Sequence, residues 1–84
     1  MSFQNYFSKR FKELRLSKGL NQYQLAAELG KPRVTITNWE IGKRTPSLDI
    51  LCELAVYFNV TLDYLTGFDC LSGNSENTDV QEAI

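Results

Sequence analysis

The stretch QYQLAAELGKPRVTITNWEI, residues 22–41, decides the fold of this 84-residue chain. It predicts two short helices, from Gln22 to Leu29 and from Pro32 to Glu40, separated by a turn at Gly30. Two helices that cross steeply through a short turn need a residue that accepts positive φ, and glycine does so without steric cost. Ala26 provides a small side chain where the two axes come close. The stretch therefore predicts a compact pair of crossed helices.

Side-chain chemistry marks where these two helices begin. Asn21 suits an N-cap, and Gln24, three residues later, can reach back to complete a capping box. Pro32 cannot continue a helix but can start one. The spacing of Trp39 from Ile36 predicts that Trp39 lies in the core instead of stacking on a ligand. The outward face of the second helix then carries Arg33, Val34, Thr35, Thr37 and Asn38.

Outside this pair the chain predicts three more helices and no strand, so the fold class is all-α, a compact five-helix bundle. Helical spacing of apolar residues predicts a helix from Tyr6 to Lys18, ended by Gly19. Ser47 is expected to cap a fourth helix, and Thr61 a fifth that ends at Gly67. The fourth helix is expected to bury Leu48, Leu51, Cys52 or Leu54, Ala55 and Phe58. A further cluster expected in the core is Phe3, Tyr6, Phe7 and Phe11.

Composition excludes several classes of protein. The chain is 43% hydrophobic and 23% charged, as in ordinary globular proteins. It has no apolar run long enough to cross a membrane and no secretory pattern, so we expect a cytoplasmic protein. Cys52 and Cys70 fit no metal-ligand or redox spacing and are expected to be reduced thiols. With no histidine, no glycine-rich phosphate loop and no paired carboxylates, the chain is not expected to be an enzyme or to bind a metal or cofactor.

The distribution of charge says more than the net charge of −1. Residues 1–68 hold nine basic and six acidic residues, a net charge of +3, and all nine basic residues precede residue 45. Residues 69–84 hold four acidic residues and no basic one. We therefore expect one mildly basic domain over residues 1–68. Residues 69–84 are expected to be a flexible, poorly ordered acidic tail, or a linker to a further domain.

Between residues 11 and 67, over about two thirds of the chain, many spaced positions follow one pattern. They are Leu14-Arg15, Gly19-Leu20-Asn21-Gln22, Leu25-Ala26, Leu29-Gly30, Thr35-Ile36, Trp39-Glu40, Gly42-Lys43-Arg44, Pro46-Ser47-Leu48, Leu51, Ala55 and Val60-Thr61-Leu62-Asp63-Tyr64-Leu65. With this pattern, residues 11–67 resemble the helix-turn-helix domain of the Cro/repressor class, the XRE family.

The resemblance implies a protein that binds double-stranded DNA as a homodimer on a partly palindromic operator. The third helix, about residues 32–40, would enter the major groove as the recognition helix, and the second would lie across the backbone. Arg33, Val34 and Asn38 match positions that read base edges. Their chemistry suits guanine O6 and N7, a thymine methyl, and adenine N6 and N7, respectively.

Other matching positions imply contacts to the DNA backbone or bracing of the recognition helix. Gln22 matches a residue that holds a phosphate, to which the backbone amides at that helix start also point. Such contacts position a protein without specifying sequence. Arg15 and Glu40 match a structural ion pair between the first helix and the end of the third. The remaining backbone or bracing candidates are Asn21, Thr35, Thr37, Lys43 and Arg44.

Three residues depart from the family pattern. Lys31 replaces an apolar residue and Pro32 replaces a Ser or Thr N-cap, so the third helix is expected to begin within one or two residues of the usual place. Ile41 replaces a polar residue and is either a dimer contact or an isolated surface residue.

The predicted function is operator-specific regulation of transcription, with repression as the outcome. An antitoxin or the controller of a restriction system would have the same domain. The alternative from another class is a protein-interaction module, in which the bundle would offer Val34, Ile41 and Ile50 to a protein partner.

Overall fold

The computed structural model describes residues 3–71, and all regular secondary structure in this part of the chain is helical. The all-α class and the five predicted helices are confirmed, and a short additional helix follows them. The helices are α1 (Phe3–Ser17), α2 (Gln22–Leu29), α3 (Arg33–Glu40), α4 (Leu48–Phe58), α5 (Leu62–Thr66) and α6 (Phe68–Leu71). Residues 72–84 of the predicted tail lie outside the described residues, so the division at residue 68 stays a prediction.

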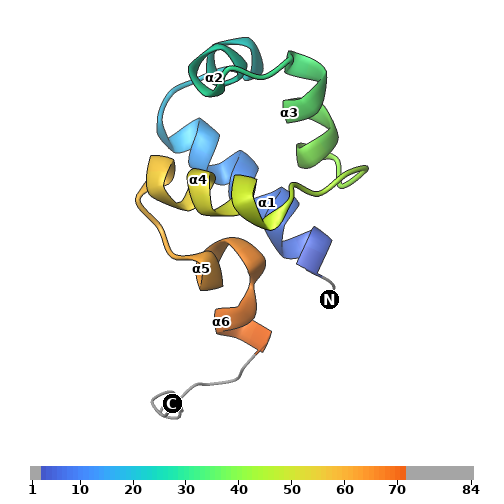
Figure 1. The fold of residues 1–84 in the computed structure, drawn as a ribbon, viewed down its shortest axis with the longest axis vertical. Coiled ribbons are helices and arrows are strands. Elements are labelled where there is room, and N and C mark those ends of the chain that lie inside the picture. Colours follow the sequence, from blue (N-terminus) through green and yellow to red (C-terminus); the bar gives the residue numbers. More distant parts are fainter. Residues whose placement is uncertain (1–2, 72–84) are drawn as a thin grey trace.

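The helices form two groups along the long axis of the molecule (Figure 1). α2 and α3 lie together at one end, and α5 and α6 lie at the other. α4 passes over α1 between the two groups. α1 contacts both α3 and α5, so the longest helix connects the crossed pair to the rest of the bundle.

The predicted caps explain why the helices begin where they do. Asn21 and Gln24 form a capping box: each side-chain oxygen accepts a hydrogen bond, at 2.8 Å, from the backbone N–H of the other residue. The hydroxyl of Ser47 caps α4, and the hydroxyl of Thr61 caps α5. Each cap satisfies a backbone donor that the first turn of a helix leaves without a partner.

The turn between α2 and α3 depends on the left-handed conformation of Gly30, with φ 68° and ψ 35°. The backbone N–H of Lys31 donates to the carbonyl of Ala26 at 2.9 Å, which closes the end of α2. Pro32 is extended, with ψ 147°, and is the N-cap of α3. α3 therefore begins at Arg33, one residue later than predicted, because Pro32 has not yet entered helical conformation.

The core is an aromatic cluster that holds α3 against α1. Trp39 is only 5% exposed, as predicted, and it lies edge-on to Phe7 and Phe11, with ring centroids 6.4 and 5.6 Å away. Edge-to-face pairs of this kind add to the stabilisation from buried area. The remaining buried apolar residues are Leu25, Ala26, Ile36, Leu51, Leu54, Ala55, Phe58 and Leu65. Of the predicted aromatic cluster, Phe7 and Phe11 are buried and Tyr6 is half-buried, and the side chain of Phe3 lies outside the described part.

Two of the candidate core residues on α4 are instead on the surface. The buried face consists of Leu51, Leu54, Ala55 and Phe58. Leu48 is 65% exposed, so its predicted burial is wrong, and of the alternatives Cys52 and Leu54 the second is buried and the first is exposed. Cys52 follows Leu51 directly and therefore projects about 100° away from it around the helix axis. Leu48, four residues before Cys52, shares that neighbouring face and lies outside the contact with the core.

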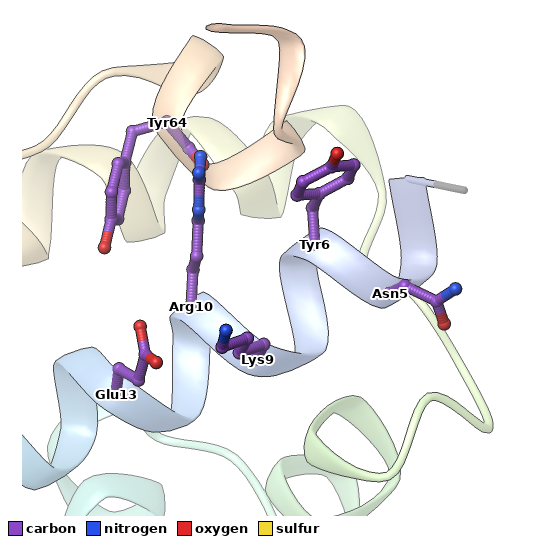
Figure 2. Close-up of a pocket in the computed structure, with 6 residues that line it drawn as sticks. All are labelled: Asn5, Tyr6, Lys9, Arg10, Glu13 and Tyr64. Carbon is purple, nitrogen blue, oxygen red and sulfur yellow. The ribbon is translucent and has the colours of Figure 1, made fainter. Parts of the chain in front are cut away.

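Arg10 attaches the last two helices to α1 (Figure 2). Its guanidinium lies near the rings of Tyr6 and Tyr64, with the central carbon 5.4 and 4.5 Å from their centroids. It donates to the carbonyl of Tyr64 at 2.7 Å and to the carboxylate of Asp69 at 2.8 Å. A side chain at Gly67 would overlap the ring of Tyr6, so this approach requires glycine there. The hollow beside Arg10, about 270 Å³, is lined by Asn5, Tyr6, Lys9, Arg10, Glu13 and Tyr64.

Candidate nucleic-acid interface

α3 has one face in the core and the opposite face on the surface. Ile36 is fully buried and Trp39 nearly so, which fixes the rotation of the helix about its axis. Arg33 is exposed and Val34 is 59% exposed. The other three residues of the predicted outward face are partly exposed: Thr35, Thr37 and Asn38. The packing of two large apolar residues therefore determines which side chains α3 presents to solvent.

A buried ion pair joins α1 to the end of α3. Arg15 Nε lies 2.6 Å from Glu40 Oε2, and Arg15 Nη2 donates to Glu40 Oε1 at 3.1 Å. Arg15 Nη1 also donates to the carbonyl of Leu20 at 2.8 Å. The two charged side chains are only 8% and 3% exposed. Buried charges need this degree of pairing, since each one is costly to remove from water.

The hydrogen-bond network continues from this ion pair to the surface. Glu40 Oε1 also accepts from Gln22 Nε2 at 3.0 Å. Gln22 Oε1 in turn accepts from Thr37 Oγ1 at 3.0 Å and from Arg33 Nη1 at 3.2 Å. The hydrogen bond to Glu40 fixes which way the Gln22 side-chain amide points, because an amide nitrogen donates and a carboxylate accepts. A continuous chain of bonds therefore runs from the buried Arg15 to the exposed Arg33.

Arg33 has two further contacts. Its Nη1 donates to Thr37 Oγ1 at 3.2 Å, one helical turn along α3. Its guanidinium carbon lies 4.7 Å from the centroid of the Tyr23 ring on α2. Tyr23 was not among the predicted site residues. The contact depends on how α2 and α3 cross, and neither position alone signals it.

The basic loop after α3 is fixed to the end of that helix. The carbonyl of Asn38 accepts from the backbone N–H of Lys43 at 3.0 Å and from that of Arg44 at 3.3 Å. Ser8 on α1 donates to the carbonyl of Trp39 at 2.9 Å. The side chains of Lys43 and Arg44 are both exposed. The structure thus places two exposed cations in the loop that directly follows α3.

Asn21 and Ile41, two other predicted residues, lie at the start of α2 and at the end of α3, respectively. Asn21 uses its side chain to cap α2 and is exposed at the start of that helix. Ile41 is 66% exposed and follows α3 directly.

Within residues 3–71, no group of three or more His, Cys, Asp or Glu side chains is placed to hold a metal ion. In the same part of the chain, none of the helices has the length and apolar character that crossing a membrane requires.

Residues 11–65 match the family described as Helix-turn-helix. The match covers more than half of the chain, and the protein therefore belongs to this family, in the Cro/repressor (XRE) class that its sequence resembles.

Individual relatives agree with that assignment. The chain is 39% identical over 59 residues to the HTH-type transcriptional activator BcrR of Enterococcus faecalis. It is 36% identical over 80 residues to the HTH-type transcriptional regulator ImmR of Bacillus subtilis. It is 35% identical over 78 residues to YonR of Bacillus subtilis, an uncharacterized HTH-type transcriptional regulator derived from the SPbeta prophage.

The relatives are longer than the matched region. The three matches cover 70%, 90% and 93% of this chain, and 29%, 63% and 68% of BcrR, ImmR and YonR, respectively. The chain therefore spans less than two thirds of BcrR and of ImmR.

Proposed function

We propose that this protein binds double-stranded DNA in a sequence-specific way and regulates transcription, with α3 in the major groove. The observation that carries the proposal is the division of α3 into a buried face, held by Ile36 and Trp39, and an exposed face that presents Arg33 and Val34. The major groove is about 12 Å wide and admits one α-helix. A helix held by its inner face can enter this groove without disturbing the bundle.

Three residues of this face are proposed to read bases. Arg33 would donate two hydrogen bonds to a guanine, and Val34 would pack on a thymine methyl. The side-chain amide of Asn38 makes no hydrogen bond to the rest of residues 3–71, so its donor and acceptor are available for an adenine. Each good bidentate pair discriminates against a wrong base by about 1–3 kcal/mol.

The surrounding polar and basic residues are proposed to hold the DNA backbone. Lys43 and Arg44 extend from the loop that is bonded to Asn38, beside the exposed face of α3. Gln22 and Asn21 lie at the start of α2, where backbone amides favour a phosphate. Thr35 offers a hydroxyl on α3, and the hydroxyl of Thr37 would brace Gln22 and Arg33. These contacts would position the protein on any sequence.

We propose that the protein acts as a homodimer on a partly palindromic operator, because one recognition helix reads only a few base pairs. Two copies would place their helices in half-sites about 34 Å apart, or a multiple of that distance. Repression is the proposed outcome, since a protein bound across a promoter blocks the polymerase. A cytoplasmic setting fits both DNA as the ligand and an exposed, unpaired Cys52.

The test uses the full chain and a pool of random duplex DNA. The duplex that the protein selects is compared with a shuffled version of the same composition, and binding is measured over a range of salt concentrations. We expect clear preference for the selected duplex, and log K that falls by about 0.9 per contacted phosphate for each unit of log salt concentration. Equal affinity for both duplexes, or a slope near zero, would refute the proposal. A reporter gene behind the selected operator then separates repression from activation.

The protein-interaction alternative has one observation in its favour. Val34 and Ile41 are 59% and 66% exposed, respectively, on and just beyond α3. Ile50, the third residue of that predicted patch, instead packs partly against the core. A partner that covered an apolar patch would bind with little dependence on salt, so the same titration separates the two functions.

A further inference from the structure

We propose that Tyr23 is a positioning residue that holds the guanidinium of Arg33 in the orientation that reads a guanine. This inference rests on the proposed function, since it assigns a role in base reading to a residue outside the recognition helix. The inference is based on three contacts of the Arg33 guanidinium. The ring of Tyr23 lies against it, and its Nη1 donates to oxygen atoms of Gln22 and Thr37.

The hydrogen bonds leave the reading edge of Arg33 available. A guanidinium has five N–H groups, two of them on Nη1. Nη1 donates to both Gln22 and Thr37, whose acceptor oxygens lie only 3.0 Å from each other. Nε and Nη2 make no hydrogen bond within residues 3–71, and their protons form the fork that can meet guanine O6 and N7. Arg33 can therefore stay bonded to the protein while it reads a base.

Two hydrogen bonds at a single nitrogen do not fix the plane of the guanidinium, because the group can still tilt about Nη1. The Tyr23 ring, 4.7 Å from the guanidinium carbon, lies against the group and opposes that tilt. Stacking on an aromatic face is favourable for a guanidinium and leaves its N–H groups at the edge. Tyr23 itself is 68% exposed, so its ring contributes little to the core.

A restrained arginine loses less conformational freedom on binding than a mobile one. It also cannot reorient to form hydrogen bonds with a wrong base. Tyr23 should therefore affect the preference for guanine and not the general affinity for DNA. An exposed cation–π contact changes an equilibrium constant by about two- to five-fold. That is the size of the effect expected when the ring is removed.

The experiment measures the affinity ratio between the duplex selected by the wild type and duplexes with one base pair changed. The Arg33→Ala variant first identifies the base pair at which Arg33 gives preference. We expect Tyr23→Ala to lower the ratio at that base pair about two- to five-fold, with the ratios at other base pairs and the salt slope unchanged. Tyr23→Phe keeps the aromatic face and should retain the wild-type ratio. Val56→Ala, at an exposed apolar residue on α4, is the matched control and should change nothing.

A double variant separates positioning from a direct contact of Tyr23 with DNA. In the Arg33→Ala background, Tyr23→Ala should have no further effect on the ratio. The inference is overturned if Tyr23→Ala keeps the wild-type ratio, if it lowers the ratio equally without Arg33, or if Tyr23→Phe loses as much as Tyr23→Ala. A wild-type protein that prefers no duplex would overturn the proposed function as well, and that failure is visible before any variant is made. Thermal unfolding confirms that each variant is folded, as expected for a site so exposed.

Discussion

Replacing Arg15 with methionine should destabilise the protein far more than an ordinary ion-pair deletion. Methionine has a similar length but no charge, so Glu40 would remain as a carboxylate that is 3% exposed and that keeps its hydrogen bond from Gln22. The carbonyl of Leu20 would also lose the donor now 2.8 Å away. Removing one partner of a buried ion pair costs about 3–5 kcal/mol, against about 0–1 kcal/mol for a solvent-exposed pair.

The expected loss is measurable because it is a large fraction of the free energy of unfolding of a small domain, which is about 5–15 kcal/mol. A loss of 1 kcal/mol lowers the midpoint of thermal unfolding by about 4–8 °C in a domain of this size, so Arg15→Met should lower it by at least about 12 °C. Circular dichroism measures the midpoint. Urea unfolding, followed by the fluorescence of Trp39, the only tryptophan of the chain, gives the free energy of unfolding.

Two control variants test whether an unpaired buried charge causes the loss of stability. Asp69→Asn breaks the ion pair with Arg10, in which Asp69 is 46% exposed, and should cost about 1 kcal/mol or less. The double variant Arg15→Met, Glu40→Leu leaves no buried charge and should recover much of the stability lost by the single variant. A single variant that loses less than about 1 kcal/mol would mean that solvent screens the pair. A double variant no more stable than the single one would mean that the unpaired charge was not the cause.

Three further predictions concern the surface. Arg33→Ala should cost about 1–3 kcal/mol in operator affinity and relax preference at one base pair, and a competition assay in which it behaves as wild type would refute the base-reading role. Lys43→Ala should weaken binding to all sequences alike and reduce the salt slope by about 0.9, so an unchanged slope would mean that Lys43 contacts no phosphate. The hydrogen bond that the Tyr57 hydroxyl donates to Glu28 raises the pKa of Tyr57 from 10.0 to about 12. Because the folded state raises this pKa, the contact stabilises fully below pH 10 and is lost as the pH rises toward 12. Absorbance titration should therefore find one tyrosine of high pKa that Glu28→Gln brings back toward 10.0, and its absence from the wild type would contradict the assignment.

Features that depend on neighbours in the sequence could be predicted, because their physical causes are local. The capping box of Asn21 and Gln24 spans one turn, and α2 occupies the predicted residues from Gln22 to Leu29. The caps at Ser47 and Thr61 have the same local origin.

Features that depend on packing could not be predicted from residue type alone. Leu48 and Cys52 are apolar enough for a core, but the rotation of α4 is set by which of its faces meets the other helices. Arg10 meets Asp69, 59 residues away, through a helix that the sequence did not signal. Tyr23 and Arg33 meet only because the turn at Gly30 fixes the crossing of α2 and α3.

The separation of inner and outer faces on α3 also bears on how such a regulator diversifies. Exposed positions outside a bonded network usually tolerate substitution within about 0.5 kcal/mol, so changes at Val34 should leave folding almost untouched. Gln22 and Thr37 are less free, because each belongs to the network that ends at the buried ion pair. Under the proposed function, preference for another duplex would therefore be reached by changes at the outermost positions, which leave the packing beneath them unchanged.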